Sequence, residues 1–199
     1  SQVEGRLGIE IKSPTDVEAD EIIWAVGAEA AQTAVWRLRP WLKAGIPGAG
    51  KLPHGRNILA GERKAMGKVL VIDEEGGWGA ISVAETLAAK EGVAAVTVVT
   101  TERTWGEADL TFTRELQQLT QRVSDAGIEV ICDAVVEEIA GATICLRDKR
   151  RIGPFDDIVL ATGTASRQFP DRAKAVGDCV APRGIWAATH DAARLARRI

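Results

Sequence analysis

Two turns that each follow an apolar run carry residue types able to hold a nucleotide. In "DIVLATGTASR" (157–167) the turn is Thr162 and Gly163, and in "AKAVGDCVAP" (173–182) it is Gly177 and Asp178. Backbone without a side chain can approach a ligand closely. A carboxylate beside a helix N-terminus can accept a sugar hydroxyl while free N–H groups face phosphate. Each turn also has a plain structural interpretation: Asp178 as an N-cap and Gly163 as the end of a strand.

A third turn, in "VIDEEGGWGAISVAE" (71–85), partly matches the diphosphate pattern G-x-G-x-x-G. The candidate contacts are Gly76, Gly77, Trp78 and Gly79. The first glycine of the pattern falls on Glu74, inside an acidic run, 73–75. Two like charges about 4 Å apart repel by about 4 kcal/mol at an effective dielectric of about 20. A bound adenine nucleotide and a plain turn with no ligand both stay open, and efficient NAD(P)H turnover is not expected.

The side chains around this third turn allow two interpretations each. Trp78 could cover an adenine ring or anchor the loop by packing. In the loop after the next strand, Glu102 could accept from a ribose 2′-hydroxyl and Arg103 could pair with a 2′-phosphate. NAD and NADP are therefore not distinguished, and a solvated charged loop is an equal alternative.

No residue is predicted to be catalytic, and no metal site is predicted. His54 and His190 have no nucleophile or metal ligand near them in sequence, and the nucleophile pattern G-x-S-x-G is absent. The cysteines, Cys132, Cys145 and Cys179, are too scattered for a disulfide framework or a metal-ligand pair. Buried, inert thiols in a reducing, cytoplasmic compartment are expected.

Composition excludes several classes of partner. The chain has 199 residues, and 25 Lys and Arg against 28 Asp and Glu give a net charge of −3, which argues against nucleic acid as the main partner. No apolar run approaches the ~20 residues of a membrane-spanning helix, so no membrane partner is expected. Whether the chain forms a homo-oligomer is left open.

The elements that must position these turns alternate between strand and helix. Apolar runs at 68–73, 94–100 and 157–161 predict strands, and helical spacing predicts helices at 80–91 and 113–126 that end at glycines. Strands with a turn at Gly141 are expected within 128–148, a loop at 101–110, and a helix at the C-terminus. Shorter strands are expected at 8–12 and 22–26, and Trp36 and Trp41 are expected to pin a connector. This order predicts an α/β fold with a Rossmann-like parallel sheet.

A sequence pattern that occurs twice suggests how the lobes are arranged. "EIIWAVGAEAA" (21–31), with Gly27 at its turn, repeats the pattern of "DIVLATGTASR" on the other side of the central block. The central block is therefore predicted to be inserted between two parts of another lobe. The expected divisions are a partial FAD-type lobe and connector at 1–60, a Rossmann-like nucleotide-binding lobe at 61–145, and the returning FAD-type segment at 146–199.

On these motifs the chain resembles the C-terminal FAD/NAD(P)-binding portion of the trimethylamine dehydrogenase and 2,4-dienoyl-CoA reductase group of NADH:flavin oxidoreductases. The segments "IIWAVGAE", "VTVVTTERTWGEAD", "IVLATGTASR" and "VGDCVAPRGIWAA" occur in the order of that group. The acidic turn and "APRGI" resemble its amine-dehydrogenase side, which includes enzymes that demethylate N-methylproline.

The resemblance implies a portion of a longer flavoprotein, with the rest of the parent polypeptide as its partner. FAD is implied at the outer lobe, and ADP or NAD(P) at the central one. FMN and a 4Fe–4S cluster are implied only in a catalytic barrel that precedes these lobes in the group. No glycine fingerprint precedes Gly27, and three scattered cysteines cannot hold a four-thiolate cluster. The FAD site is therefore expected to be incomplete and the chain inactive alone, and the start at Ser1 with only Met66 as methionine fits that expectation.

Overall fold

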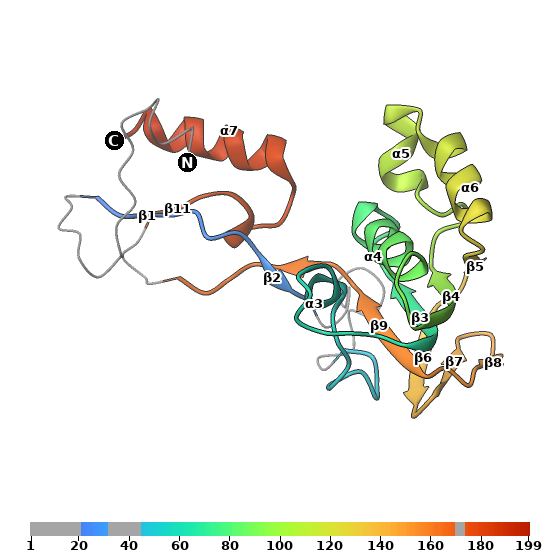
Figure 1. The fold of residues 1–199 in the computed structure, drawn as a ribbon. Helices are drawn as coiled ribbons and strands as arrows, with labels where there is room; N and C mark the ends of the chain where they lie inside the picture. The colour runs from blue at the N-terminus through green and yellow to red at the C-terminus, as the bar shows by residue number, and fades with distance from the viewer. Residues whose placement is uncertain (1–20, 32–44, 170–173) are drawn as a thin grey trace. The chain divides into compact units, whose positions relative to one another are not determined.

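The computed structural model describes residues 21–31, 45–169 and 174–199, in two compact units (Figure 1). The larger unit is Ala30–Ala165, and the described part of the smaller one is 21–29, 166–169 and 174–199. The expected strand at 8–12 and the expected anchors Trp36 and Trp41 lie outside the described residues. The nucleotide-binding roles assigned to 1–60, 61–145 and 146–199 stay predictions.

A four-stranded parallel sheet forms the centre of the larger unit, in the order β5–β4–β3–β9. Its strands are β3 (Gly67–Asp73), β4 (Val93–Thr100), β5 (Glu129–Ile131) and β9 (Asp157–Ala161). β3 and β9 are buried over most of their length, as expected for parallel strands covered on both faces. The predicted α/β class with a Rossmann-like parallel sheet is confirmed.

Three helices lie on one side of this sheet in Figure 1. They are α4 (Trp78–Ala88), α5 (Glu107–Thr113) and α6 (Leu116–Asp125). The two predicted helices are present as α4 and α6, but the predicted loop at 101–110 is wrong in its second half, which begins α5. Gly106, with φ of 85°, turns the chain there, and Glu107 and Asp109 place negative charge in the first helical turn, which stabilises a helix start.

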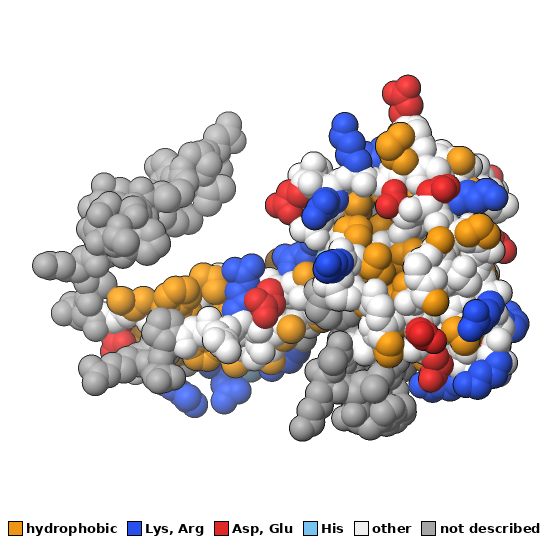
Figure 2. Space-filling model, turned by 90° about the horizontal axis from the view of Figure 1, so that it is seen from below, with side chains coloured by type: hydrophobic (Ala, Val, Ile, Leu, Met, Phe, Trp, Pro, Cys, Tyr) orange, Lys and Arg blue, Asp and Glu red, His pale blue; other side chains and the backbone are white. Residues whose placement is uncertain are grey.

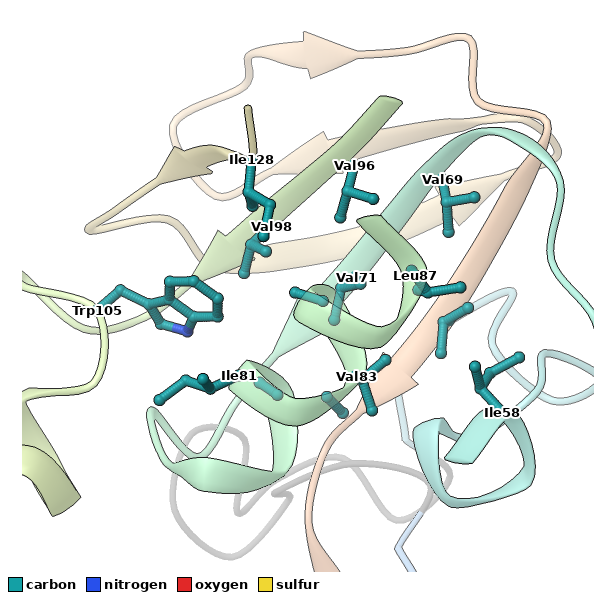
Figure 3. Packing of buried hydrophobic residues seen from close by; sticks show 14 of the residues in the cluster. Ile58, Val69, Val71, Ile81, Val83, Leu87, Val96, Val98, Trp105 and Ile128 are labelled. Carbon is teal, nitrogen blue, oxygen red and sulfur yellow. The ribbon is translucent and has the colours of Figure 1, made fainter. Parts of the chain in front are cut away.

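Alternate residues of each strand build two separate hydrophobic cores. On one face Val69, Val71 and Val98 pack with Ile81 and Leu87 of α4, as Figure 3 shows, together with Trp105 and residues of α5 and α6. On the other face Leu70 and Ile72 pack with Val99 of β4, with Ile158 and Leu160 of β9, and with apolar side chains within residues 136–146. The side-chain period of two along a strand explains why one apolar run serves both cores.

The second face is covered by an antiparallel sheet, β6–β7–β8. Its strands are β6 (Val136–Ala140), β7 (Thr143–Leu146) and β8 (Arg151–Ile152). The predicted turn at Gly141 joins β6 to β7, and its φ of 63° suits glycine. β8 was not predicted, because two residues are too few to show a period.

The described part of the smaller unit contains short strands and one long helix. β1 (Ile23–Trp24) pairs in parallel with β11 (Lys174–Ala175), and the 3₁₀ turn η2 (Gly177–Cys179) leads toward α7 (Ile185–Ala196). The expected C-terminal helix and the strand at 22–26, here shortened to β1, are thus present. Elsewhere, β2 (Glu29–Ala30) pairs with β10 (Thr164–Ala165).

Charges on the larger unit are interspersed. Figure 2 shows basic and acidic side chains side by side over the visible face of that unit. On this unit Arg122 pairs with Glu85 at 2.7 Å, and Arg147 pairs with Glu137 at 2.8 Å. Within the described residues, no helix is both long enough and apolar enough to cross a bilayer.

Truncating Leu87 should strongly destabilise the larger unit. Leu87 is 0% exposed and joins α4 to the first core, so Leu87→Ala leaves a cavity and should lower the free energy of unfolding by about 2–5 kcal/mol. Leu59→Ala, at a side chain 46% exposed, is the matched control and should lower it by about 1 kcal/mol or less. Urea unfolding followed by circular dichroism measures both, and equal losses would contradict this account of the core.

Candidate functional site

The candidate site lies at the carboxyl ends of the parallel strands, where β3 ends at a buried acid, Asp73. Its Oδ1 accepts the backbone N–H groups of Glu75 at 3.0 Å and Gly76 at 2.9 Å. Its Oδ2 accepts the Thr100 hydroxyl and the Trp105 indole N–H, both at 3.0 Å. One carboxylate therefore shapes the turn after β3 and joins it to the end of β4 and to the loop that follows.

The environment of Asp73 acts on its pKa in two directions. Asp73 is 1% exposed, and this burial raises the pKa of its carboxyl, while the four donors oppose the rise. Because the raised pKa means that the folded state holds the proton more tightly, ionisation of Asp73 lowers stability as pH rises through its folded pKa. The donors limit that loss, since each one favours the charged form.

The N-terminus of α4 is capped by a carboxylate from another helix. Gly77 occupies the N-cap and has no side chain to offer, and the N–H of Trp78 instead donates to Asp109 Oδ2 at 3.0 Å. A Cβ at Gly77 would collide with that carboxylate. Asp109 thus lies where a negatively charged ligand group would have to bind in order to use the helix N-terminus.

Two more acidic side chains lie against glycines, one in this turn and one after β9. A Cβ at Gly76 would collide with the side chain of Glu102, and a Cβ at Gly163 would collide with the carboxylate of Glu75. The N–H groups of Glu75, Gly76 and Trp78 all donate to carboxylates of this chain. These three donors are therefore not free for a diphosphate, and the acidic side chains beside them would repel one.

The other predicted contacts near this turn lie as follows. Trp78 is 39% exposed at the start of α4, and Gly79 follows it in the first helical turn. Arg103 is exposed in the loop after β4, whereas Glu102 is half-buried against Gly76. The structure therefore brings Gly76, Gly77, Trp78 and Glu102 together. Their nucleotide contacts stay predictions.

Thr162 and Gly163 hold a distant part of the chain. The Thr162 hydroxyl donates to the carbonyl of Ala31 at 2.6 Å, and the Ala31 N–H donates to the carbonyl of Gly163 at 3.0 Å. Gly163 has φ of 90°, which glycine adopts readily. The Ala-Thr-Gly turn after β9 thus lies next to the acidic turn after β3, as the lining of a shared cavity also indicates.

The remaining predicted contacts, Gly27, Gly177 and Asp178, belong to the smaller unit. Asp178 Oδ1 accepts the N–H groups of Arg183 at 3.1 Å and Gly184 at 3.3 Å, just before α7. No hydrogen bond to Asp178 Oδ2 occurs within the described part of the chain, so this oxygen can accept one from a ligand hydroxyl. At Gly177 a Cβ would approach Ala188 Cβ to 3.1 Å, so packing against α7 also requires a small residue.

Sequence reasoning missed His54, which is 8% exposed in the larger unit. His54 is the N-cap of α3 (Gly55–Leu59), where its Nδ1 accepts the N–H of Arg56 at 3.2 Å and its own N–H donates to Asn57 at 3.2 Å. Its Nε2 is buried and makes no well-aligned hydrogen bond among the described residues, although the Gly163 backbone lies close enough to act on the pKa of the ring. The "HGRN" segment could have indicated a helix cap, but no local signal shows that β9 and α4 enclose the ring.

The described residues add no metal site and no disulfide. They contain no group of three or more His, Cys, Asp or Glu side chains placed to hold a metal ion. The three cysteines are free, and only Cys179 is fully buried. Its Sγ lies 3.3 Å from the carbonyl of Trp24, so this thiol joins η2 to β1.

Several solved structures share the fold of nearly the whole chain. The 6-hydroxypseudooxynicotine amine oxidase of Pseudomonas geniculata N1 superposes with a TM-score of 0.76 at 28% identity, covering 89% of this chain and 28% of its own. Histamine dehydrogenase of Rhizobium sp. 4-9 gives 0.73 at 20% identity, covering 89% of this chain and 30% of its own. A 2-naphthoyl-CoA reductase gives 0.69 at 19%, covering 90% of this chain and 27% of its own.

The chain thus spans under a third of the length of these proteins. No protein-family model and no curated protein sequence matches it. The three structures are of the trimethylamine dehydrogenase and dienoyl-CoA reductase group, so the resemblance predicted from the sequence is confirmed.

Removing the Asp109 carboxylate should destabilise the start of α4. Asp109→Ala leaves the Trp78 N–H without its acceptor, and loss of such a cap should lower the free energy of unfolding by about 1 kcal/mol. Asp109→Asn keeps an oxygen acceptor and should lose less. Glu107→Ala, an exposed acid in the same turn of α5, is the control. Urea unfolding compares the three, and a loss for Glu107→Ala equal to that for Asp109→Ala would refute the capping role.

Stability should fall with acidification in a way that depends on His54. Burial is the largest cause that lowers the pKa of His54, and the charge of Arg56 lowers it further. The backbone of Gly163 opposes this shift. Glu75 is the acidic residue that lines the same cavity. The unfolded chain therefore takes up this proton first. Stability is complete above the ordinary pKa of 6.5 and is lost as pH falls through the folded pKa.

Urea unfolding between about pH 7.5 and pH 5.5 measures this effect, which is at most about 1.4 kcal/mol per pH unit for one group. His54→Phe should flatten the profile, whereas a variant at the only other histidine, His190→Gln, should keep it. Identical profiles for the native chain and His54→Phe would show that His54 does not titrate as described.

Proposed function

We propose that this chain is the FAD- and dinucleotide-binding-type portion of a longer flavin-dependent oxidoreductase that oxidises methylated amines. The observation that carries the proposal is a parallel sheet with an acidic turn after β3, in a fold shared with an amine oxidase at 28% identity over 89% of the chain. The parent's substrate-oxidising chemistry is assigned to a barrel outside this chain. The cytoplasm is the proposed compartment, since the thiols are free.

The proposed FAD contacts in the smaller unit are the residues after β1 and β11. Asp178 supports this assignment, because α7 fixes one of its oxygens and the other can accept a ribityl hydroxyl. Thr162 and Gly163, in the larger unit, stay proposed nucleotide contacts, because backbone without a side chain can approach a ligand closely. When bound, FAD supplies electron transfer, whereas the protein residues only bind and orient it.

The central lobe is proposed to act without NAD(P)H turnover. Asp73 and Asp109 accept three N–H groups of this turn, Glu102 lies against Gly76, and Glu75 lies against Gly163. Repulsion between these acids and a diphosphate opposes binding. This feature favours the amine-oxidising function. The alternative is a dienoyl-CoA-reductase-like use of NAD(P)H, and a 2-naphthoyl-CoA reductase is one of the structures that share the fold.

The parent polypeptide, purified with its own cofactors, tests the function. We expect dye reduction that saturates with trimethylamine or N-methylproline, and no flavin bleaching by NADPH on the timescale of turnover. Rapid bleaching by NADPH with consumption of an enoyl-CoA, and no response to amines, would assign the reductase function instead.

The 199-residue chain alone gives a second measurement. We expect no turnover and no tight, stoichiometric FAD uptake by visible absorbance, since the first glycine fingerprint is not in the sequence. Calorimetry with ADP should show no saturable heat, because the turn is covered by acids. Saturable ADP binding would refute the account of the turn and favour a nucleotide-binding module. FAD uptake at one molecule per chain would refute the incomplete site.

A further inference from the structure

The described part of the smaller unit buries little apolar surface and exposes much. Among the described residues, eight of the twelve exposed large apolar side chains belong to this unit, although it contributes far fewer residues than the larger one. Both hydrophobic cores lie in the larger unit. Scattered exposed apolar side chains are ordinary on a protein, but a concentration of them marks an interaction surface.

The outward face of α7 carries the two most exposed of these side chains. Ile185 is 83% exposed and Trp186 is 76% exposed, whereas Ala187 is buried on the side of the helix that faces the unit. The Trp186 ring stacks on the ring of His190 with centroids 5.5 Å apart. The first turns of α7 therefore present an ordered apolar and aromatic patch to the outside.

This face lacks the charges that a solvated helix normally carries. Within residues 185–193 the only Asp, Glu, Lys or Arg is Asp191, which is half-buried and pairs with Arg183. The hydroxyl of Thr189 donates to backbone carbonyls of its own helix. Because a helix that faces water usually has charged residues on its outer face, the composition of this one is that of a buried contact.

The strands of the same unit are also short of partners. Among the described residues β1 pairs only with β11, over two residues of each strand. Parallel strands usually belong to larger sheets covered on both faces, and a two-stranded sheet alone is marginally stable. Ile22 and Ile23 are exposed there. A further surface that covers this unit would stabilise both α7 and β1.

We propose that the outward face of α7, formed by Ile185, Trp186, Thr189 and His190, docks a part of the parent polypeptide outside this chain. The proposal rests on the proposed function in one respect, that the chain belongs to a longer flavoprotein. More than two thirds of each of the three similar solved chains lies outside the region shared with this one. Permanent interfaces are more apolar than transient ones, so an uncharged face built around a tryptophan fits a permanent contact with an apolar surface.

Hydrogen exchange measured by mass spectrometry compares the 199-residue chain with the parent holoenzyme. Peptides that cover 185–193 should exchange about tenfold or more slowly in the parent, since burial of one large apolar side chain stabilises by at least that factor. Peptides from α6 in the larger unit are the control and should exchange equally in both.

Variants separate docking from the stability of α7 itself. Trp186→Gln keeps a good helix former and should leave the melting temperature of the 199-residue chain unchanged, but lower that of the parent by about 2 °C or more. Phe112→Gln, at an apolar side chain 90% exposed in the larger unit, is the matched control and should change neither. Ile185→Gln provides a second variant of the same face if Trp186→Gln does not fold.

Three results would overturn the proposal. One is equal exchange of 185–193 in the chain and in the parent. Another is protection of these residues in the 199-residue chain at every concentration, which would show that this chain covers its own helix. The third is protection that rises with concentration together with a dimer mass, which would identify a second copy as the occupant. Turnover of amines is measured separately, so a parent that protects α7 but reduces an enoyl-CoA would refute the proposed function alone.

Discussion

The buried carboxylate of Asp73 is the interaction on which this site depends. It accepts two backbone N–H groups of the turn after β3, the Thr100 hydroxyl at the end of β4, and the Trp105 indole. Four donors on two oxygens use the accepting capacity of an ionised carboxyl well, and this offsets part of the unfavourable effect of burying it. The turn is therefore held from inside the protein, without help from a ligand.

A turn fixed in this way changes the electrostatics of everything near it. In a nucleotide-binding turn, free N–H groups and a helix N-terminus attract phosphate. Here Asp109 satisfies the Trp78 N–H, and Glu75 and Glu102 lie against Gly163 and Gly76. Four acidic side chains therefore lie at this turn, and they would repel a phosphate. A shared fold thus does not imply a shared ligand, because binding depends on the site.

The sequence predicted the sheet well, because long apolar strands and glycine-terminated helices repeat with a clear period. β3, β4, β9, α4 and α6 are present near their expected positions. α5 was missed, since its start depends on Gly106 and two acids inside a polar loop. Asp73 was recognised only as one of three charges. Its role depends on Trp105, thirty-two positions away in sequence, and no periodic pattern encodes such a contact.

The environment of His54 also could not be predicted in full from the sequence. Its neighbours in sequence explain only the Nδ1 atom, which caps α3. The other nitrogen is defined by β9 and α4, which follow much later in the chain.

The glycines of the acidic turn show why a motif can be present without the function with which it is associated. A Cβ at a glycine would collide with whatever group lies closest to it, and that group need not be a ligand. In dinucleotide-binding folds that group is a diphosphate, or a helix packed close to a strand. At Gly76 and Gly77 of this turn, and at Gly163 after β9, it is an acidic side chain of the same chain. The glycine pattern therefore reports close approach alone. The charge of the approaching group, which decides whether a nucleotide can bind, is determined by the acids that the fold brings to these glycines.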